Sequence, residues 1–272
     1  AIIVSVYFAT PRSVHPLVAG VLAGGLLQLL LQLKPMSSGV PWRARAALEP
    51  HEGLPEIGRL LGPLAFSLGV TQVQILGERM LASGLADGVI TSMNLVQKLV
   101  NLPLGLVGMA VAAPLMPALS RHEAAGDRAQ FARDLARGLL ISVAAIAPLS
   151  ALCLVASDEV VRVLFLRGAF GEQSVADAAR MLWHYAFGLP AVSVTFLLTG
   201  AFLAQGIATT PALVRAGLLT ANIALNWAWL ERMQVAGIPL AWSLMYMVNA
   251  LALLWLASRR HAELKGARVL AA

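Results

Sequence analysis

Long stretches without a charged residue alternate with short charged connectors along the chain. The main uncharged windows are residues 13–33, 60–77, 99–120, 138–157, 181–214, 216–230 and 233–258. Most of these windows are close to the roughly 20 residues that an α-helix needs to cross about 30 Å of hydrocarbon. The pattern predicts an all-α fold, a polytopic bundle of membrane helices.

The longest window, 181–214, is divided by a turn at Gln205-Gly206, and Pro211 suits the first turn of the next helix. Seven full spans and one partial span at residues 1–9 follow from this division. The full spans are predicted at 14–34, 56–79, 87–119, 131–156, 177–204, 209–230 and 236–258. We expect four regions: the end of a first group of helices (1–34), a cytoplasmic linker (35–55), a second bundle (56–258) and a cytoplasmic tail (259–272).

Composition supports a membrane protein and argues against several other classes. Hydrophobic residues make up 58% of the chain and charged residues 12%, whereas about 25% is usual for charged residues in soluble domains. The net charge of +6 lies in connectors rather than in a basic stripe with aromatic residues, so nucleic acid is not a predicted partner. The single cysteine, Cys153, excludes a disulfide framework within the chain. No GxSxG, HExxH or P-loop motif is present, so we predict transport rather than an enzyme.

The distribution of positive charge predicts the orientation in the membrane. When the 20 Lys and Arg residues are divided between alternate connectors, the poorer side receives only Arg12, Arg79, Arg162, Arg167, Arg180 and Arg232. All the others except Lys98, which lies within a span, fall on the richer side. The positive-inside rule makes the richer side cytoplasmic, so we expect the C-terminus in the cytoplasm.

The connector at 158–174 alternates charged residues with bulky apolar ones. This pattern is typical of a short helix that lies in the outer membrane interface. A structural clip between two spans is the alternative interpretation.

Lys98 is the leading candidate for a functional residue. It lies 11 residues beyond the start of its predicted span, or about 16 Å along a helix that rises 1.5 Å per residue. A lysine at that depth costs about 2.5–3.5 kcal/mol, so we expect it to face a polar cavity or an anionic partner. The alternative is a longer or tilted span that leaves Lys98 nearer the interface. Pro103, Gly105 and Gly108 follow on the same span and predict a bend that serves as a hinge.

Asn222 and Asn226 are four residues apart and therefore share one face of a helix. In lipid their amides need partners. Two interpretations stay open: hydrogen bonds to another helix, and oxygen ligands for a cation together with Glu78.

Several motifs together resemble one family of membrane proteins. NLVQKLVNLPLGLVGMAVAAPLMPALSRHEAAGD (94–127) is similar to the helix and loop typical of the MurJ (MviN) lipid II flippases. Further matches follow in the family's order: GGLLQLLLQL (24–33), LFLRGAF (164–170), TPALVRA (210–216), ANIALN (221–226) and GIPLAWSL (237–244).

The resemblance implies a two-lobed fold of the multidrug/oligosaccharidyl-lipid/polysaccharide exporter superfamily. It also implies a plasma-membrane flippase that moves lipid-linked peptidoglycan precursor between the leaflets of a bacterial membrane by alternating access. The matched region runs from the end of the fifth helix to the twelfth. The first lobe is then supplied by a separate chain, or the chain is a fragment of a longer protein.

By the same resemblance, the anionic lipid-linked substrate is bound by Lys98, Gln97, Asn94 and Asn101. Lys98 stands where the family usually has an arginine, and Gln97 replaces a frequent acid. A sodium ion, if one is bound, is held by Glu78, Asn222 and Asn226. Asn226 stands where an acid is expected, and Trp242 where a small hydroxyl is expected. Two alternatives remain: another exporter of the superfamily, for a different glycan lipid or a drug, and a non-transporting scaffold for envelope synthesis.

Overall fold

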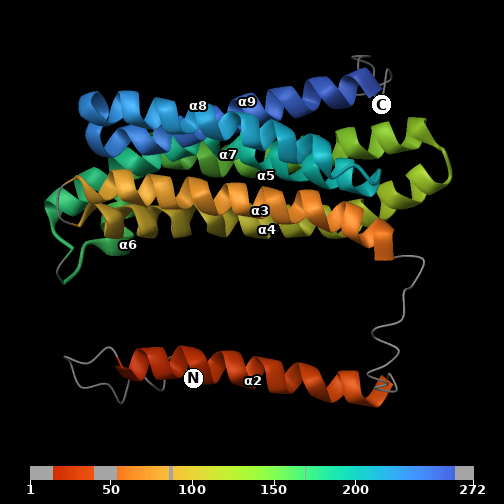
Figure 1. The fold of residues 1–272 in the computed structure, drawn as a ribbon. Coiled ribbons are helices and arrows are strands. Elements are labelled where there is room, and N and C mark those ends of the chain that lie inside the picture. Colours follow the sequence, from red (N-terminus) through yellow and green to blue (C-terminus); the bar gives the residue numbers. More distant parts are fainter. Residues whose placement is uncertain (1–14, 40–53, 86–87, 169, 261–272) are drawn as a thin grey trace. The chain divides into compact units, whose positions relative to one another are not determined.

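The computed structural model describes residues 15–39, 54–85, 88–168 and 170–260 (Figure 1). The chain divides into two compact units, residues 1–54 and 55–272. In the first unit, α2 spans His15–Gly39. The predicted partial span at 1–9, most of the predicted linker, and the tail beyond Arg260 lie outside the described residues.

The second unit is a bundle of long helices joined by short connections (Figure 1). Its elements are α3 (Leu54–Ser83), α4 (Val89–Ala124), α5 (Arg128–Val155), the short α6 (Ser157–Phe165), α7 (Glu172–Ala204), α8 (Thr209–Met233), the 3₁₀ turn η2 (Gln234–Ala236) and α9 (Gly237–Arg260). Each of the seven predicted spans corresponds to one long helix, and this confirms the predicted fold class.

Four helical stretches in the described residues are long and apolar enough to cross a membrane: α4, α5, α7, and η2 with α9. α3 and α8 are also long, with 30 and 25 residues. Polar side chains interrupt their apolar character, among them buried Glu78 on α3 and buried Asn222 and Asn226 on α8. These two helices therefore have polar groups in the interior of the bundle.

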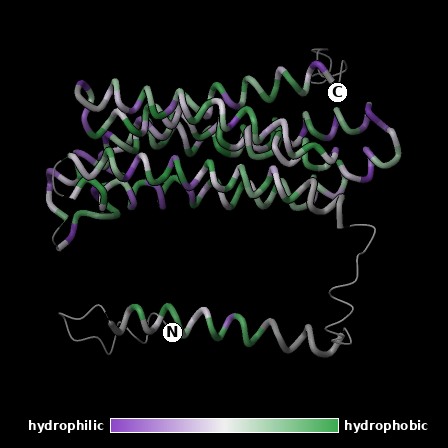
Figure 2. Tube along the Cα trace, viewed as in Figure 1, coloured by the Kyte–Doolittle hydropathy of each residue, from purple (hydrophilic) through white to green (hydrophobic). Residues whose placement is uncertain are grey.

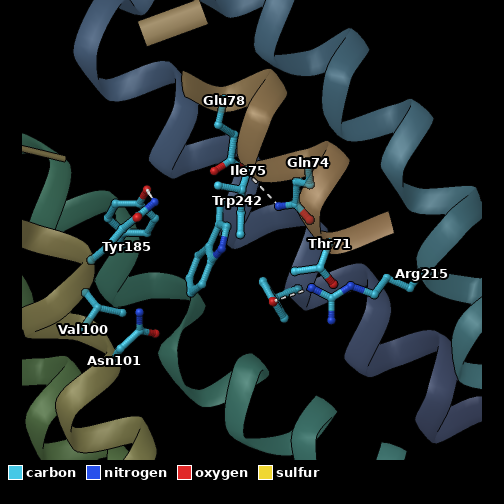
Figure 3. A pocket seen from close by; sticks show the side chains of 11 residues that line it. Thr71, Gln74, Ile75, Glu78, Val100, Asn101, Tyr185, Arg215 and Trp242 are labelled. Atoms are coloured by element: carbon cyan, nitrogen blue, oxygen red, sulfur yellow. Dashed lines mark hydrogen bonds between the residues drawn. The ribbon is translucent and has the colours of Figure 1, made fainter. Parts of the chain in front are cut away.

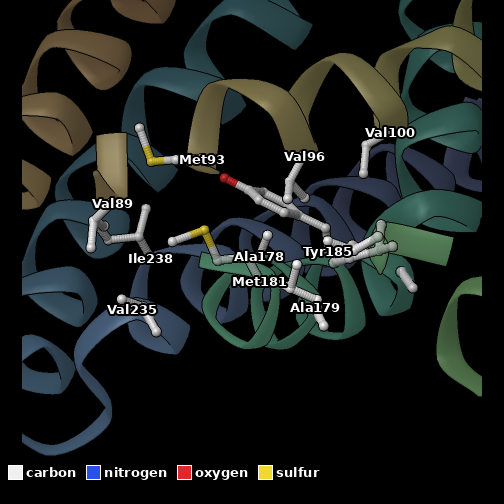
Figure 4. Close-up of a cluster of buried hydrophobic side chains, with 14 of the residues drawn as sticks. Val89, Met93, Val96, Val100, Ala178, Ala179, Met181, Tyr185, Val235 and Ile238 are labelled. Atoms are coloured by element: carbon white, nitrogen blue, oxygen red, sulfur yellow. The ribbon is translucent and has the colours of Figure 1, made fainter. Parts of the chain in front are cut away.

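α7 is the central helix of the second unit, since it contacts α4, α5, α6, α8 and α9. Figure 4 shows one apolar cluster on it, where α4 side chains such as Val96 meet α7 side chains such as Met181 and Tyr185. A second cluster lies further along the bundle around Phe131 and Leu197. α7 thus has apolar partners along much of its length.

Hydrophilic residues gather near the ends of the second unit, and the middle of its helices is mostly hydrophobic (Figure 2). Large apolar side chains are also exposed on the outside of the helices, for example Leu106 and Met109 on α4. Such a surface suits lipid, because soluble monomers rarely expose apolar patches of this kind. The chain is an integral membrane protein.

The turn between α4 and α5 has local sequence signals for a chain reversal. Gly126 has a φ of 70°, in the left-handed region that glycine tolerates best. Asp127 then caps α5, because its carboxylate accepts a hydrogen bond of 2.9 Å from the backbone N–H of Gln130. The two helices consequently run antiparallel.

The predicted interfacial segment at 158–174 is only partly helical. α6 ends at Phe165, and α7 already begins at Glu172, five residues before the predicted start of its span. Gly168, with a φ of 61°, lies in the loop between them and explains the break. Arg162 contacts Asp158 on α6 at 3.3 Å and Glu172 on α7 at 2.8 Å. The segment therefore contains both a short helix and a clip to the next span.

α4 runs without interruption through Pro103, Pro114 and Pro117. Each proline lacks an N–H, so one backbone carbonyl of the preceding turn loses its helical donor. The predicted hinge at Pro103, Gly105 and Gly108 lies on this weakened part of α4. Its role in motion stays a prediction.

Candidate functional site

A polar pocket of about 170 Å³ lies inside the second unit, between α3, α4, α7, α8 and α9 (Figure 3). Its lining combines polar, aromatic and aliphatic side chains: Thr71, Gln74, Ile75, Glu78, Gln97, Val100, Asn101, Tyr185, Arg215, Trp242 and Tyr246. Two of them are charged, Glu78 and Arg215. A polar cavity within membrane helices is the usual place for a substrate or ion pathway.

α3 contributes the acidic side of the pocket. Val70, Gln74, Glu78 and Ala82 are spaced by four residues, and all four are buried, so one face of α3 points inward. The amide nitrogen of Gln74 donates a hydrogen bond of 2.8 Å to a carboxyl oxygen of Glu78. Glu78 is only 3% exposed, and this contact keeps its carboxyl group within the pocket.

α8 contributes the basic side of the pocket. Arg215 donates a hydrogen bond of 3.2 Å from Nη2 to the hydroxyl of Tyr246 on α9. Its guanidinium carbon lies 5.8 Å from the centre of the Tyr246 ring, within the range of a cation–π contact. The Nε atom of Arg215 is buried and has no hydrogen-bond partner among the described residues.

Aromatic rings form the wall of the pocket between α7 and α9. Trp242 contacts Tyr185 edge to face at 5.0 Å and Tyr246 at 4.6 Å between ring centres. Gln97 on α4 donates a hydrogen bond of 3.2 Å to the Tyr185 hydroxyl. The side chains of α4, α7 and α9 are therefore connected around the pocket.

Of the predicted substrate residues, Gln97 and Asn101 line the polar pocket, whereas Asn94 and Lys98 do not. Asn94, Lys98, Asn101 and Gly105 are spaced by three or four residues and form a stripe along α4, which we call the Lys98 stripe. Lys98 is exposed and forms no ion pair with the part of the chain that the structure describes. Its cationic group is thus free to meet an anion from outside the unit.

Asn101 also belongs to a second, mostly apolar pocket of about 310 Å³ between α4 and α7. The predicted hinge residues Gly105 and Gly108 line this pocket, together with Phe196 of α7. A Cβ atom on Gly108 would come 3.5 Å from the Phe196 ring, whereas one on Gly105 would meet nothing within 4 Å. Asn101 therefore lies where polar and apolar surfaces of α4 meet.

The three predicted sodium ligands come from two helices, Glu78 from α3 and the two asparagines from α8, and all three are buried. Glu78 lines the polar pocket, but Asn222 and Asn226 are not among its lining residues. Asn226 donates a hydrogen bond of 3.0 Å to the Asn222 side-chain oxygen, within α8. The side-chain nitrogen of Asn222 and the side-chain oxygen of Asn226 are buried and have no hydrogen-bond partner among the described residues. No group of three or more His, Cys, Asp or Glu suited to a metal occurs in the described ranges.

Arg215 is the main residue of this site that the sequence analysis missed. It was counted among the connector charges, but the structure places it within α8, at the polar pocket. The available signal was its position, six residues after the start of the predicted span at 209–230. Trp242 entered only through the family resemblance, and Gln74, Tyr185 and Tyr246 gave no comparable signal, because such residues are common in membrane helices.

The bundle of long apolar helices around a polar pocket defines a polytopic membrane protein. The family model "Lipid II flippase MurJ" matches residues 1–272. The chain belongs to the MurJ family.

Individual relatives agree with this assignment. A probable lipid II flippase MurJ of Rhizobium meliloti is 31% identical over 238 residues, covering 86% of this chain and 44% of that protein. The lipid II flippase MurJ of Burkholderia cenocepacia is 27% identical over 268 residues, covering 96% and 52% respectively. A solved structure of lipid II flippase MurJ in an inward closed conformation has the same fold, with a TM-score of 0.76 and 20% identity, covering 94% of this chain and 53% of that one. The chain spans about half the length of these relatives.

Proposed function

We propose that the chain forms the C-terminal lobe of a lipid II flippase, which moves the undecaprenyl-diphosphate-linked peptidoglycan precursor across the bacterial plasma membrane. Membership of the MurJ family supports this function. The observation that carries it in the structure is the exposed Lys98 stripe beside a polar pocket within the bundle. A first lobe, on the same chain or on another, completes the cavity that the stripe faces.

Lys98 binds the diphosphate of the substrate in this proposal. Its ammonium group supplies a positive charge and three hydrogen-bond donors. The amides of Asn94 and Asn101 lie one turn away on the same face of α4 and donate to neighbouring oxygens of the substrate. Lysine lacks the planar fork of arginine, so its contact with phosphate is less directional.

Alternating access then requires two arrangements of the lobe that bind the substrate with different affinity. α4 is suited to bending near Pro103, where the helical hydrogen-bond ladder is interrupted. Gly105 and Gly108 follow within two turns and leave space toward α7. Movement there repositions Lys98 relative to the pocket.

Complementation of a MurJ-depleted bacterial strain tests the role of Lys98. The chain is expressed alone and together with a first-lobe segment of a relative. We expect the wild type with a first lobe to restore growth, Lys98→Ala to abolish it because the diphosphate loses its counter-charge, and Lys98→Arg to retain it. Membrane fractionation verifies that each variant is inserted.

Arg121→Ala is the matched control, since Arg121 is also an exposed cation on α4 but lies in its last turn. This variant is expected to grow as the wild type does. Normal growth of Lys98→Ala would remove Lys98 from the mechanism. Failure of the wild-type chain to restore growth with a compatible first lobe would overturn the flippase proposal itself.

A further inference from the structure

The polar pocket contains a carboxyl group in surroundings that would suit a free cation. Glu78 is buried, and Thr71 and Gln74 on the same helix contribute further oxygen atoms to the lining. Hard cations such as sodium prefer oxygen ligands of this kind. Where a buried carboxyl group stays ionised it needs a compensating positive charge, because an unpaired carboxylate in an apolar interior is costly.

A positive charge is already present in the pocket. Arg215 directs its guanidinium into it from α8 (Figure 3), and it is the only cationic residue among those that line the pocket. Its hydrogen bond to Tyr246 holds the guanidinium there, and its buried Nε still lacks a partner among the described residues. With Glu78 ionised, the charges of the lining side chains add up to zero.

We propose that Arg215, which lines the same pocket as Glu78 without forming an ion pair with it, is a tethered counter-cation for this carboxylate and makes the site independent of sodium. A mobile cation entering the pocket would be repelled by the guanidinium and would give the site a net positive charge. The amides of Asn222 and Asn226, which could have supplied further oxygen ligands, bond to each other and do not line the pocket. Arg215 is therefore the residue that determines ion specificity here.

The consequence for transport rests on the proposed flippase function: the lobe changes between its two states without taking up sodium. The ion-binding property does not rest on it. It is a property of the pocket alone, so binding measurements test it whether or not the chain moves a lipid.

Sodium binding to the purified chain in nanodiscs tests the proposal directly. Radioactive sodium and thermal unfolding are measured in sodium, potassium and choline chloride at equal ionic strength of about 0.15 M. The wild type should show no saturable sodium binding and the same Tm in all three salts. Saturable binding by the wild type that is lost in a folded Glu78→Gln variant would overturn the proposal.

Arg215→Gln removes the tethered charge and keeps a polar side chain. We expect this variant to acquire saturable sodium binding, and its Tm to rise by about 2–4 °C in sodium relative to choline, the size of shift that ligand binding gives in a chain of this length. Arg215→Lys, which keeps a positive charge, should behave as the wild type. A folded Arg215→Gln variant that ignores sodium would contradict the proposal.

Two further variants test whether the sodium response arises in the pocket or elsewhere in the chain. Arg79→Gln is the matched control, because Arg79 is the exposed neighbour of Glu78 on α3 and does not line the pocket. Like the wild type, this variant should show no saturable sodium binding and the same Tm in all three salts. The double variant with Glu78→Gln and Arg215→Gln should lose the sodium response that Arg215→Gln acquires. A response that persists in the double variant would place the ion elsewhere and refute the assignment.

Discussion

Single residues set how closely the helices of the second unit approach one another. Gly188 on α7 faces Ser243 on α9, and a Cβ atom built on Gly188 would lie 2.7 Å from the serine oxygen and 2.9 Å from its Cα. Ser243 in turn donates a hydrogen bond of 2.6 Å to the carbonyl of His184. Small residues at such crossings allow membrane helices to pack closely.

Gly188→Val should therefore destabilise the bundle by about 1–3 kcal/mol, the usual cost of overpacking a tight contact. The backbone of Ser243, which faces Gly188, cannot move without shifting the whole of α9. Thermal unfolding of the purified chain in nanodiscs measures the effect. Gly217→Val is the control, because Gly217 lies within α8 with nothing within 4 Å of its Cβ position. Equal stability of the two variants would show that the α7–α9 contact is not tight.

At the scale of elements, α6 is attached to the bundle in two ways that differ in strength. Val161 is completely buried and belongs to the apolar cluster of α4 and α7. Arg162 forms the exposed ion pairs to Asp158 and Glu172, and the hydrogen bond that it donates to the Glu172 carboxylate is the main reason that the pKa of Arg162 is raised. Exposed ion pairs contribute little because water and salt screen them.

We expect burial rather than charge to hold α6 in place. Val161→Ala removes two methyl groups from an apolar contact outside the spans and should weaken the docking of α6 by about 1–2 kcal/mol. Arg162→Gln should have a much smaller effect. Hydrogen exchange of the α6 backbone amides measures both variants. Faster exchange in Arg162→Gln than in Val161→Ala would assign the attachment to the ion pairs instead.

For the whole molecule, the antiparallel α5 separates two connectors. The turn at 125–127 lies at one end of α5, and α6 with its following loop lies at the other (Figure 1). The positive-inside rule predicts that the first connector is cytoplasmic and the second is outside. The same rule predicts a cytoplasmic C-terminus.

Site-directed labelling tests this orientation. Cys153 is the only cysteine, so Cys153→Ala provides a background without thiols. In that background Arg167→Cys should react with a membrane-impermeant maleimide in intact spheroplasts, whereas Arg128→Cys should react only after lysis. Both native side chains are exposed, so access within the protein is matched. The reverse labelling pattern would invert the predicted topology.

The sequence by itself determined the class of protein and the positions of its helices. A stretch of about 20 uncharged residues in a bilayer has to satisfy its backbone hydrogen bonds internally, so it forms a helix whatever its neighbours are. The predicted start of α7 is five residues too late because polar residues, Glu172, Gln173 and Ser174, begin the helix ahead of the apolar stretch. The motifs that resemble the MurJ family, among them the one around Lys98, agree with the family model that matches residues 1–272.

Only the tertiary structure decided which faces of these helices meet. Helical periodicity shows that Gln74 and Glu78 share a face of α3, or that Lys98 and Asn101 share a face of α4. It does not show which other helix that face meets, because this depends on side-chain packing between segments far apart in the chain. The presence of Arg215 and Glu78 in one pocket is a result of that packing.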